Sequence, residues 1–148
     1  MLSYERLVAE HQEIESDAAD LLQHAGRRPL DPAAIAKTRW SFSRKLLTHL
    51  TKEDLLLYPM LRRSPLPEVA ALAERAIDDV GGLGDAVKDY MRRWTSDSMT
   101  ADPDGFERDT QHLVAALRDR ILREESQLYR HIPGAPAEPK VDGRARAA

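Results

Sequence analysis

Two similar segments, HLTKEDLLLYP at residues 49–59 and RILREESQLYR at residues 120–130, form an internal repeat in this chain. Each copy has a glutamate in its fifth position, and the first residue is His49 in one copy and Arg120 in the other. In an α-helix, residues four apart lie one turn apart on the same face. Histidines and carboxylates in this arrangement form metal sites inside helix bundles. The repeat therefore predicts a bundle with a metal-type centre, one half of which is altered.

Helical patterns extend along most of the chain. Apolar residues recur at helical spacing in residues 3–26, 31–63, 67–94 and 103–132, and no run alternates as a β-strand would. Helix-start residues accompany these segments, namely Ser3, Asp31-Pro32, Ser64-Pro65 with Pro67, and Asp102-Pro103. Short loops between long helices make neighbours antiparallel. The sequence thus predicts an all-α, left-handed up-down-up-down four-helix bundle over residues 1–133, followed by a disordered tail over residues 134–148.

Length and composition limit the possible functions. A chain of 148 residues suits one domain, and the absence of cysteine excludes thiolate ligands and disulfides. The formal charge is −3 with 32% charged residues of both signs, so no electrostatic argument favours nucleic acid as a partner. No apolar run approaches the roughly 20 residues of a membrane helix, and the N-terminus has no signal-peptide core. We therefore expect a cytoplasmic protein without a membrane partner.

Polar side chains interrupt the apolar stripes of three predicted helices. Five of them fall at core-facing positions, namely His11, His49, Glu53, Arg120 and Glu124. A charge buried without a partner is costly, so these groups must meet one another or a metal. A single histidine on an apolar face is more often a hydrogen-bonded core residue than a ligand. Two histidines and two glutamates on three helices instead predict one cluster near the middle of the bundle.

These residues resemble the hemerythrin-like, or HHE cation-binding, family. The resemblance extends over about residues 2–133 and rests on VAEHQEIE around His11, THLTKEDLLLYP around His49 and Glu53, and ILREESQLY around Glu124. It implies an up-down-up-down bundle. Members of the family usually hold two non-haem irons and serve in oxygen carriage, in oxygen or nitric oxide sensing, or in iron handling.

The resemblance implies ligands for one of the two irons only. The first iron takes a histidine and a carboxylate from the second helix and one further ligand from each of the first and fourth helices, which here are His11, His49, Glu53 and Glu124. The second iron depends on two histidines of the third helix and one of the fourth. Those positions correspond to Val80, Gly84 and Arg120, and the third helical segment contains no histidine in any register. We therefore expect no di-iron centre.

The centre is left with two alternatives, a single metal ion or none. Nitrogen and oxygen donors such as His11, His49, Glu53 and Glu124 suit iron, zinc or manganese. Arg120 has a permanent charge that pairs with carboxylates, so it is predicted to occupy the second iron position and bind one or both glutamates. It would then complete a one-metal site or neutralise a metal-free core. Otherwise Arg120 extends towards solvent, and the cluster is a buried salt-bridge network.

The sequence GGLG at residues 81–84 falls within the third helical segment, at the depth of the cluster. Its three glycines weaken a helix by roughly 2–3 kcal/mol relative to alanine. This loss indicates a kink, or room for a bulky neighbour such as Arg120.

Two functions from different classes are consistent with these observations. The first is a diverged hemerythrin-like protein with at most one metal ion, which senses or buffers the metal or a small ligand such as oxygen or nitric oxide. The second is a metal-free helical interaction module in which Arg120 replaces the second metal. Trp40, Leu47 and Tyr58 lie on a line opposite His49 and form a candidate surface for a homodimer or a protein partner. No nucleophile with a positioned base is apparent, so we do not expect an enzyme.

Overall fold

All regular secondary structure is helical in residues 2–137, the part of the chain that the computed structural model describes. The α-helices are α1 (Tyr4–Ala25), α2 (Pro32–Lys52), α3 (Tyr58–Arg62), α4 (Pro67–Val80), α5 (Leu83–Arg93), α6 (Ser96–Ala101) and α7 (Pro103–Arg123). Two π-helical turns continue α2 and α7, namely η1 (Glu53–Leu57) and η2 (Glu124–Leu128), and the 3₁₀ turn η3 (Tyr129–His131) follows η2. The predicted all-α class is therefore confirmed for these residues.

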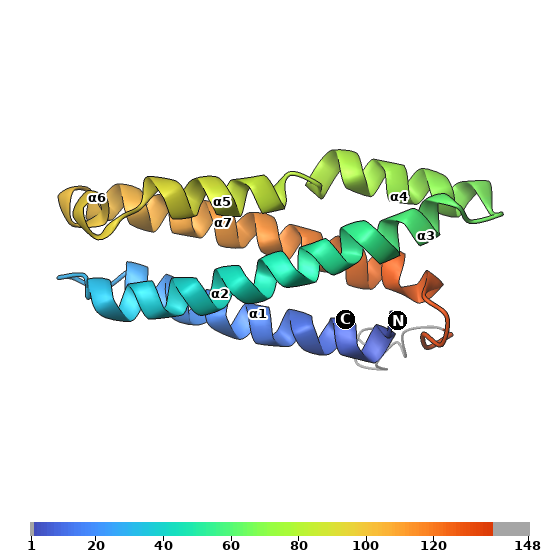
Figure 1. Cartoon of the computed structure of the whole chain (residues 1–148), viewed down its shortest axis with the longest axis horizontal. Coiled ribbons are helices and arrows are strands. Elements are labelled where there is room, and N and C mark those ends of the chain that lie inside the picture. The colour runs from blue at the N-terminus through green and yellow to red at the C-terminus, as the bar shows by residue number, and fades with distance from the viewer. Residues whose placement is uncertain (1, 138–148) are drawn as a thin grey trace, which may run out of the picture.

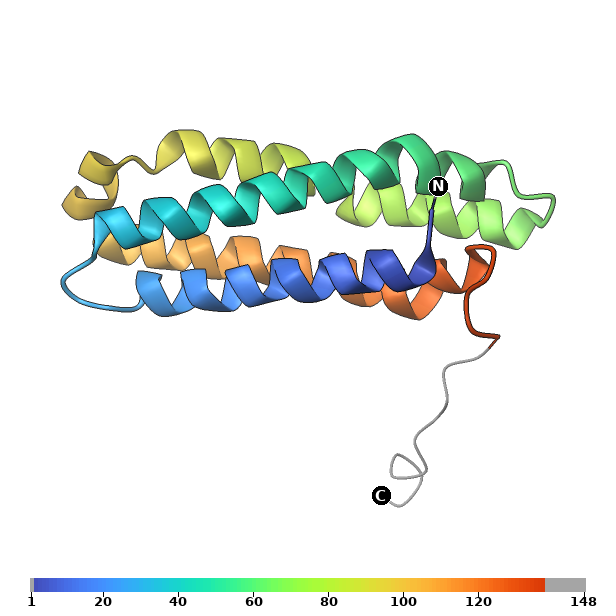
Figure 2. The same cartoon turned by 60° about the horizontal axis from the view of Figure 1, so that its bottom comes forward.

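The long helices pack side by side along one axis (Figures 1 and 2). Helix α1 contacts both α2 and α7, α5 contacts α7, and α3 contacts α4 at the opposite end from α6. No helix of the described residues is long and apolar enough to cross a membrane.

Polar side chains begin three of the helices as predicted. Ser3, Asp31 and Asp102 each accept a hydrogen bond from the backbone N–H three residues further along the chain. These bonds satisfy N–H groups that have no partner within the helix. Pro67 begins α4 without such a side-chain cap.

The predicted third helix is broken. Helix α4 ends at Val80 and α5 begins at Leu83, and Figure 1 shows the interruption as a thin loop. A Cβ atom on Gly81 would lie 2.4 Å from the carbonyl oxygen of Ile77, so only glycine fits this turn as it stands. The prediction of one continuous helix over residues 67–94 was therefore wrong, whereas the predicted weakness at the glycines is confirmed. The short helix α6, capped by Thr95 and Ser98, was not predicted.

We expect Gly81→Ala to lower the free energy of unfolding by about 1–3 kcal/mol, because the new methyl group must displace backbone. Gly82→Ala is the matched control, since a Cβ atom there meets nothing within 4 Å and the φ angle of Gly82 is −82°, which alanine adopts without strain. That variant should be unchanged or more stable by up to about 1 kcal/mol. Urea denaturation measures both, and equal effects of the two variants would contradict this account of the break.

The two π-helical turns occupy the same position in the two copies of the repeat. They begin at Glu53 and Glu124, and the backbone N–H of Tyr58 and of Tyr129 donates to the carbonyl of the glutamate five residues earlier. In a regular α-helix, residues five apart point about 140° away from each other. The wider π turn reduces this angle, which brings each tyrosine towards the same interior as its glutamate.

Buried apolar side chains form two clusters, and the polar positions fall between them. On α1, Leu7 belongs to one cluster, Ile14 belongs to the other, and His11 lies between them. The same order is found along α2 with η1, where Leu50 and Leu57 of the two clusters flank Glu53. It is also found along α7 with η2, where Leu117 and Leu128 flank Arg120 and Glu124. The core is therefore divided by one polar layer.

Little of the predicted tail over residues 134–148 can be compared with the structure. Gly134 lies in a turn and has a positive φ of 85°, and the following residues up to 137 form no helix. Residues 138–148 lie outside the described part of the chain.

Candidate metal centre

Four predicted ligands meet in the polar layer. His11 of α1, His49 of α2, Glu53 of η1 and Glu124 of η2 each offer one donor atom, and these atoms all lie within 4.8 Å of one another. None of the four residues is more than 3% exposed. The predicted convergence is observed, because the flanking apolar residues hold each of these elements in a single register.

The His49 ring is oriented by a carboxylate on its outer side. Its Nδ1 lies 2.8 Å from Glu10 Oε1, and Lys52 Nζ donates to the other oxygen of Glu10 at 2.5 Å. Nδ1 therefore carries a hydrogen, and Nε2 faces Glu53 Oε1 at 3.3 Å. A carboxylate behind the imidazole is the usual support of a metal-binding histidine. Glu10 was not predicted, although it directly precedes His11 in the sequence.

The His11 ring also turns its Nε2 inward, where it lies 3.1 Å from Glu124 Oε1. Its buried Nδ1 lies 3.4 Å from Glu125 Oε2, but the two atoms are not aligned for a hydrogen bond. The imidazoles of His11 and His49 approach each other with ring centroids 4.7 Å apart. Both rings therefore direct Nε2 into the same space.

Arg120 lies inside the core and does not extend to solvent, since it is only 2% exposed. Its guanidinium donates to Glu53 Oε1 at 3.2 Å and to Glu124 Oε2 at 3.0 Å. A third bond, at 3.3 Å, goes to the carbonyl of Val80 at the break after α4. The prediction that Arg120 binds one or both glutamates is confirmed, and it binds both. Burial alone would lower the pKa of Arg120, but the charges of Glu124 and Glu53 outweigh this effect and raise it above its usual value.

The two glutamates differ in their electrostatic environment. Burial by itself raises the pKa of both, yet hydrogen bonding and charge from His49 hold the pKa of Glu53 below its usual range. The pKa of Glu124 is raised by burial and by the charge of Glu53. Burial lowers the pKa of His49, but its bond to Glu53 outweighs that effect and raises it. In the metal-free cluster, Arg120 is therefore the permanent cation beside both carboxylates, and the bond to Glu53 favours the protonated form of His49.

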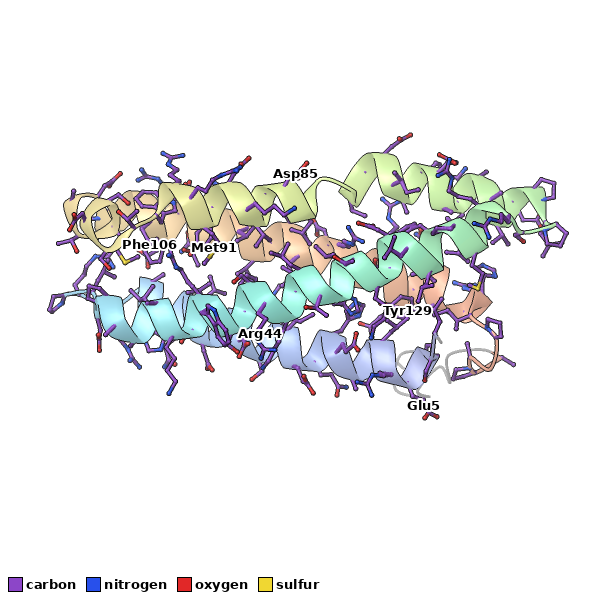
Figure 3. The ribbon with its side chains drawn as sticks, viewed as in Figure 1. Glu5, Arg44, Asp85, Met91, Phe106 and Tyr129 are labelled. Carbon is purple, nitrogen blue, oxygen red and sulfur yellow. The ribbon has the colours of Figure 1, made fainter. Side chains whose placement is uncertain are left out.

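Two tyrosines exchange hydrogen bonds between the copies of the repeat. Tyr58 Oη donates to Glu124 Oε2 at 2.9 Å, and Tyr129 Oη donates to Glu53 Oε2 at 2.7 Å. Figure 3 labels Tyr129, which lies within the bundle, in contrast to Glu5 at its outer edge. Burial raises the pKa of both tyrosines strongly. The sequence did contain a signal for these two residues, because both copies of the repeat have a tyrosine at the same position.

The predicted partner surface of Trp40, Leu47 and Tyr58 is wrong in its last member. Tyr58 is only 4% exposed, and its ring lies under the guanidinium of Arg120. Trp40 is 63% exposed and Leu47 is partly buried. The error arose because the prediction assumed an uninterrupted α-helix, whereas η1 turns Tyr58 inward.

The donors suit one metal ion. Bonds of about 2.0–2.2 Å to nitrogen and oxygen place neighbouring ligand atoms around one ion about 3 Å apart. The pairs His11–Glu124 at 3.1 Å and His49–Glu53 at 3.3 Å have this spacing. Imidazole and carboxylate together suit iron, zinc or manganese. The position on the other side of the glutamates is filled by Arg120, so the residues present do not fit a second ion.

The structure defines a helical protein with a buried histidine and carboxylate cluster that could hold a metal ion. A family model described as the Hemerythrin HHE cation binding domain matches residues 2–132. The chain therefore belongs to this family. Searches of curated proteins and of solved structures gave no significant match.

Proposed function

We propose that this protein binds a single metal ion through His11, His49, Glu53 and Glu124, and that it senses or buffers this metal or a small ligand of it. One observation supports this most strongly: the donor atoms of these four residues, which come from α1, α2, η1 and η2, all lie within 4.8 Å of one another. The carboxylate of Glu10 supports His49 from behind. We also propose that the helices follow the up-down-up-down four-helix topology that the sequence predicts.

The residues of this chain prepare the cluster for a cation. Glu10 keeps Nδ1 of His49 protonated, so that Nε2 is the nitrogen left for a ligand bond. Arg120 holds one oxygen of each glutamate. The other oxygen faces the inside of the cluster, where Glu53 Oε2 contacts Tyr129 and Glu124 Oε1 contacts His11. Iron, zinc or manganese would supply a positive charge here, and iron would also offer a position at which oxygen or nitric oxide can bind. A metal ion binds Nε2 of His49 only when this nitrogen carries no proton, so proton and metal compete for it.

A surface groove between α1 and α7 is the proposed route of a small ligand to this centre. His11 and Glu125 form part of its wall, together with the apolar side chains of Ile121 and Leu122. Three hydroxyls of α2 have partners of their own: Ser43 and Thr48 donate to helix carbonyls, and Ser41 donates to Asp17. We therefore propose a binding protein and not an enzyme.

Elemental analysis of protein purified without a metal-affinity tag tests the proposal, followed by calorimetric titration with Zn²⁺ and, without oxygen, Fe²⁺. We expect no more than one ion per chain in the purified protein, and a stoichiometry of one ion per chain at the end of the titration. Two ions per chain, or the absorption of a bridged di-iron pair, would contradict a mononuclear site.

A metal-free interaction module is the second candidate, and the Arg120 contacts favour it. Arg120, the two tyrosines and His11 already satisfy the oxygens of Glu53 and Glu124, so the core does not depend on a cation from outside. Protein that contains no metal and takes up none in the titration would establish this candidate in place of the first.

We expect Glu10→Gln to weaken metal binding by about 10–100-fold, because the amide supports His49 less strongly than a carboxylate does. Glu13→Gln, an exposed change on the same helix, is the control and should bind as the parent does. Calorimetric titration with Zn²⁺ compares the three proteins. Equal affinities would mean that Glu10 only makes a surface ion pair with Lys52.

A further inference from the structure

We propose that the phenol oxygen of Tyr129 is a fifth ligand of the metal ion. This inference rests on the proposed function, because it requires that an ion is bound by His11, His49, Glu53 and Glu124. It adds a residue that neither the histidine and glutamate motifs nor the family match identifies as a ligand.

The position of Tyr129 Oη carries the inference. It lies 2.7 Å from Glu53 Oε2, 2.9 Å from His11 Nε2, 3.4 Å from His49 Nε2 and 3.5 Å from Glu124 Oε1. One oxygen atom therefore lies near all four of the other donor residues. These distances resemble those between the other donors, and neighbouring ligands of one ion are spaced in the same way, about 3 Å apart.

The ring of Tyr129 is held so that this oxygen cannot move away easily. The residue is fully buried, its ring stacks on His11 at a centroid distance of 5.2 Å and an angle of 13°, and Tyr4 packs against it edge to face. Swinging the side chain outward would open the apolar cluster that contains Leu7 and Leu128. An ion within reach of all four donors must therefore lie beside Oη and bind it.

Tyr58 has the matched position in the repeat but not the same role. Its hydroxyl bonds to Glu124 Oε2, the oxygen that also accepts from Arg120, and its ring lies 5.4 Å from the Arg120 guanidinium carbon. No hydrogen bond joins it to either histidine among the described residues. The repeat thus places one tyrosine on the side of the histidines and the other on the side of the arginine.

Coordination replaces the O–H bond of Tyr129 with a bond from oxygen to the metal, and the proton is released to solvent. Glu53 Oε2, which accepts this proton in a hydrogen bond in the metal-free protein, is thereby freed. A phenolate bound to ferric iron absorbs visible light through charge transfer from ligand to metal. Imidazole and carboxylate ligands alone do not give this band, so it reports the tyrosine directly.

The experiment adds ferric nitrilotriacetate to the full chain, and records iron content and visible absorption after excess reagent is removed. We expect one iron per chain and the phenolate band in the parent protein and in Tyr90→Phe, a control at a buried tyrosine of α5 that bonds to Thr110 outside the cluster. Tyr129→Phe should lose the band. Circular dichroism checks that both variants are folded. Resonance Raman spectra of the iron-loaded parent, excited in the band, should show phenolate ring vibrations even if Tyr129→Phe does not fold.

The possible outcomes separate this inference from the function on which it rests. One iron per chain without the band in the parent, or an undiminished band in Tyr129→Phe, would overturn the role of Tyr129 and leave the metal site intact. Tighter iron binding by Tyr129→Phe would also overturn it, because the hydroxyl would then obstruct the ion. A parent protein that binds no metal would overturn both.

Discussion

Replacing Arg120 with methionine is expected to lower the free energy of unfolding of the metal-free protein by about 3–5 kcal/mol. Arg120 is 2% exposed and donates to both Glu53 and Glu124, which are themselves buried. Removing one partner of a buried ion pair leaves the other charge without compensation. The Val80 carbonyl at the end of α4 loses its bond as well. Urea denaturation at neutral pH in the presence of a chelator measures this loss.

A bound metal should reduce the effect of Arg120→Met. An ion at the cluster neutralises the same carboxylates, so the loss in metal-loaded protein is expected to be smaller and to grow when the chelator is added. Arg118→Met is the matched control on α7, because Arg118 forms an exposed ion pair with Glu15 and should cost no more than about 1 kcal/mol. If Arg120→Met were as stable as Arg118→Met in both conditions, the proposed role of Arg120 in the core would be wrong.

The second large effect concerns the metal. We expect His49→Ala to lower the affinity for Zn²⁺ by more than about 100-fold, which is the upper range for losing a residue that only supports a ligand. His49 supplies an inward Nε2 that is 3.3 Å from Glu53, and no other histidine of the described residues can replace it. The ring is also held from outside by Glu10. Calorimetric titration of the metal-free variant measures the change.

His112→Ala provides the control for this experiment. His112 is an exposed residue of α7, outside the cluster, and its loss should leave both the affinity and the stoichiometry unchanged. Equal affinities of the two variants would show that Zn²⁺ binds somewhere other than the buried cluster, and the assignment of His49 as a ligand would fail.

Much of the centre could be predicted from the sequence because polar residues at core positions are rare and costly. His11, His49, Glu53, Arg120 and Glu124 each interrupt an apolar stripe, and helical spacing alone places them on inward faces. Their convergence then follows from packing those faces together. The pairing of Arg120 with both glutamates could be predicted for the same reason, since it is the permanent cation among them.

The failures come from places where the backbone departs from a regular α-helix. Tyr58 was placed on the surface because nine residues of α-helix separate it by half a turn from His49. The π turn η1 changes that angle, and local sequence patterns do not show where such a turn forms. The break at Gly81 and Gly82 was visible as a weakness, yet the sequence did not show that it would end one helix and begin another.

The sequence by itself determined the chemical types available at the centre: two imidazoles, two carboxylates, one guanidinium, and no histidine in the third helical segment. In the function proposed here these types suit one metal ion at most, because the third helical segment has no histidine that packing could bring to the site. Only the tertiary structure decided which atoms meet. Glu10 supports His49 and not the adjacent His11, and Tyr129, but not Tyr58, reaches both histidines. These contacts depend on the directions of side chains from three helices and two π turns. Shifts of a few ångströms between these elements change which atoms meet, and residue spacing in the sequence does not show such shifts.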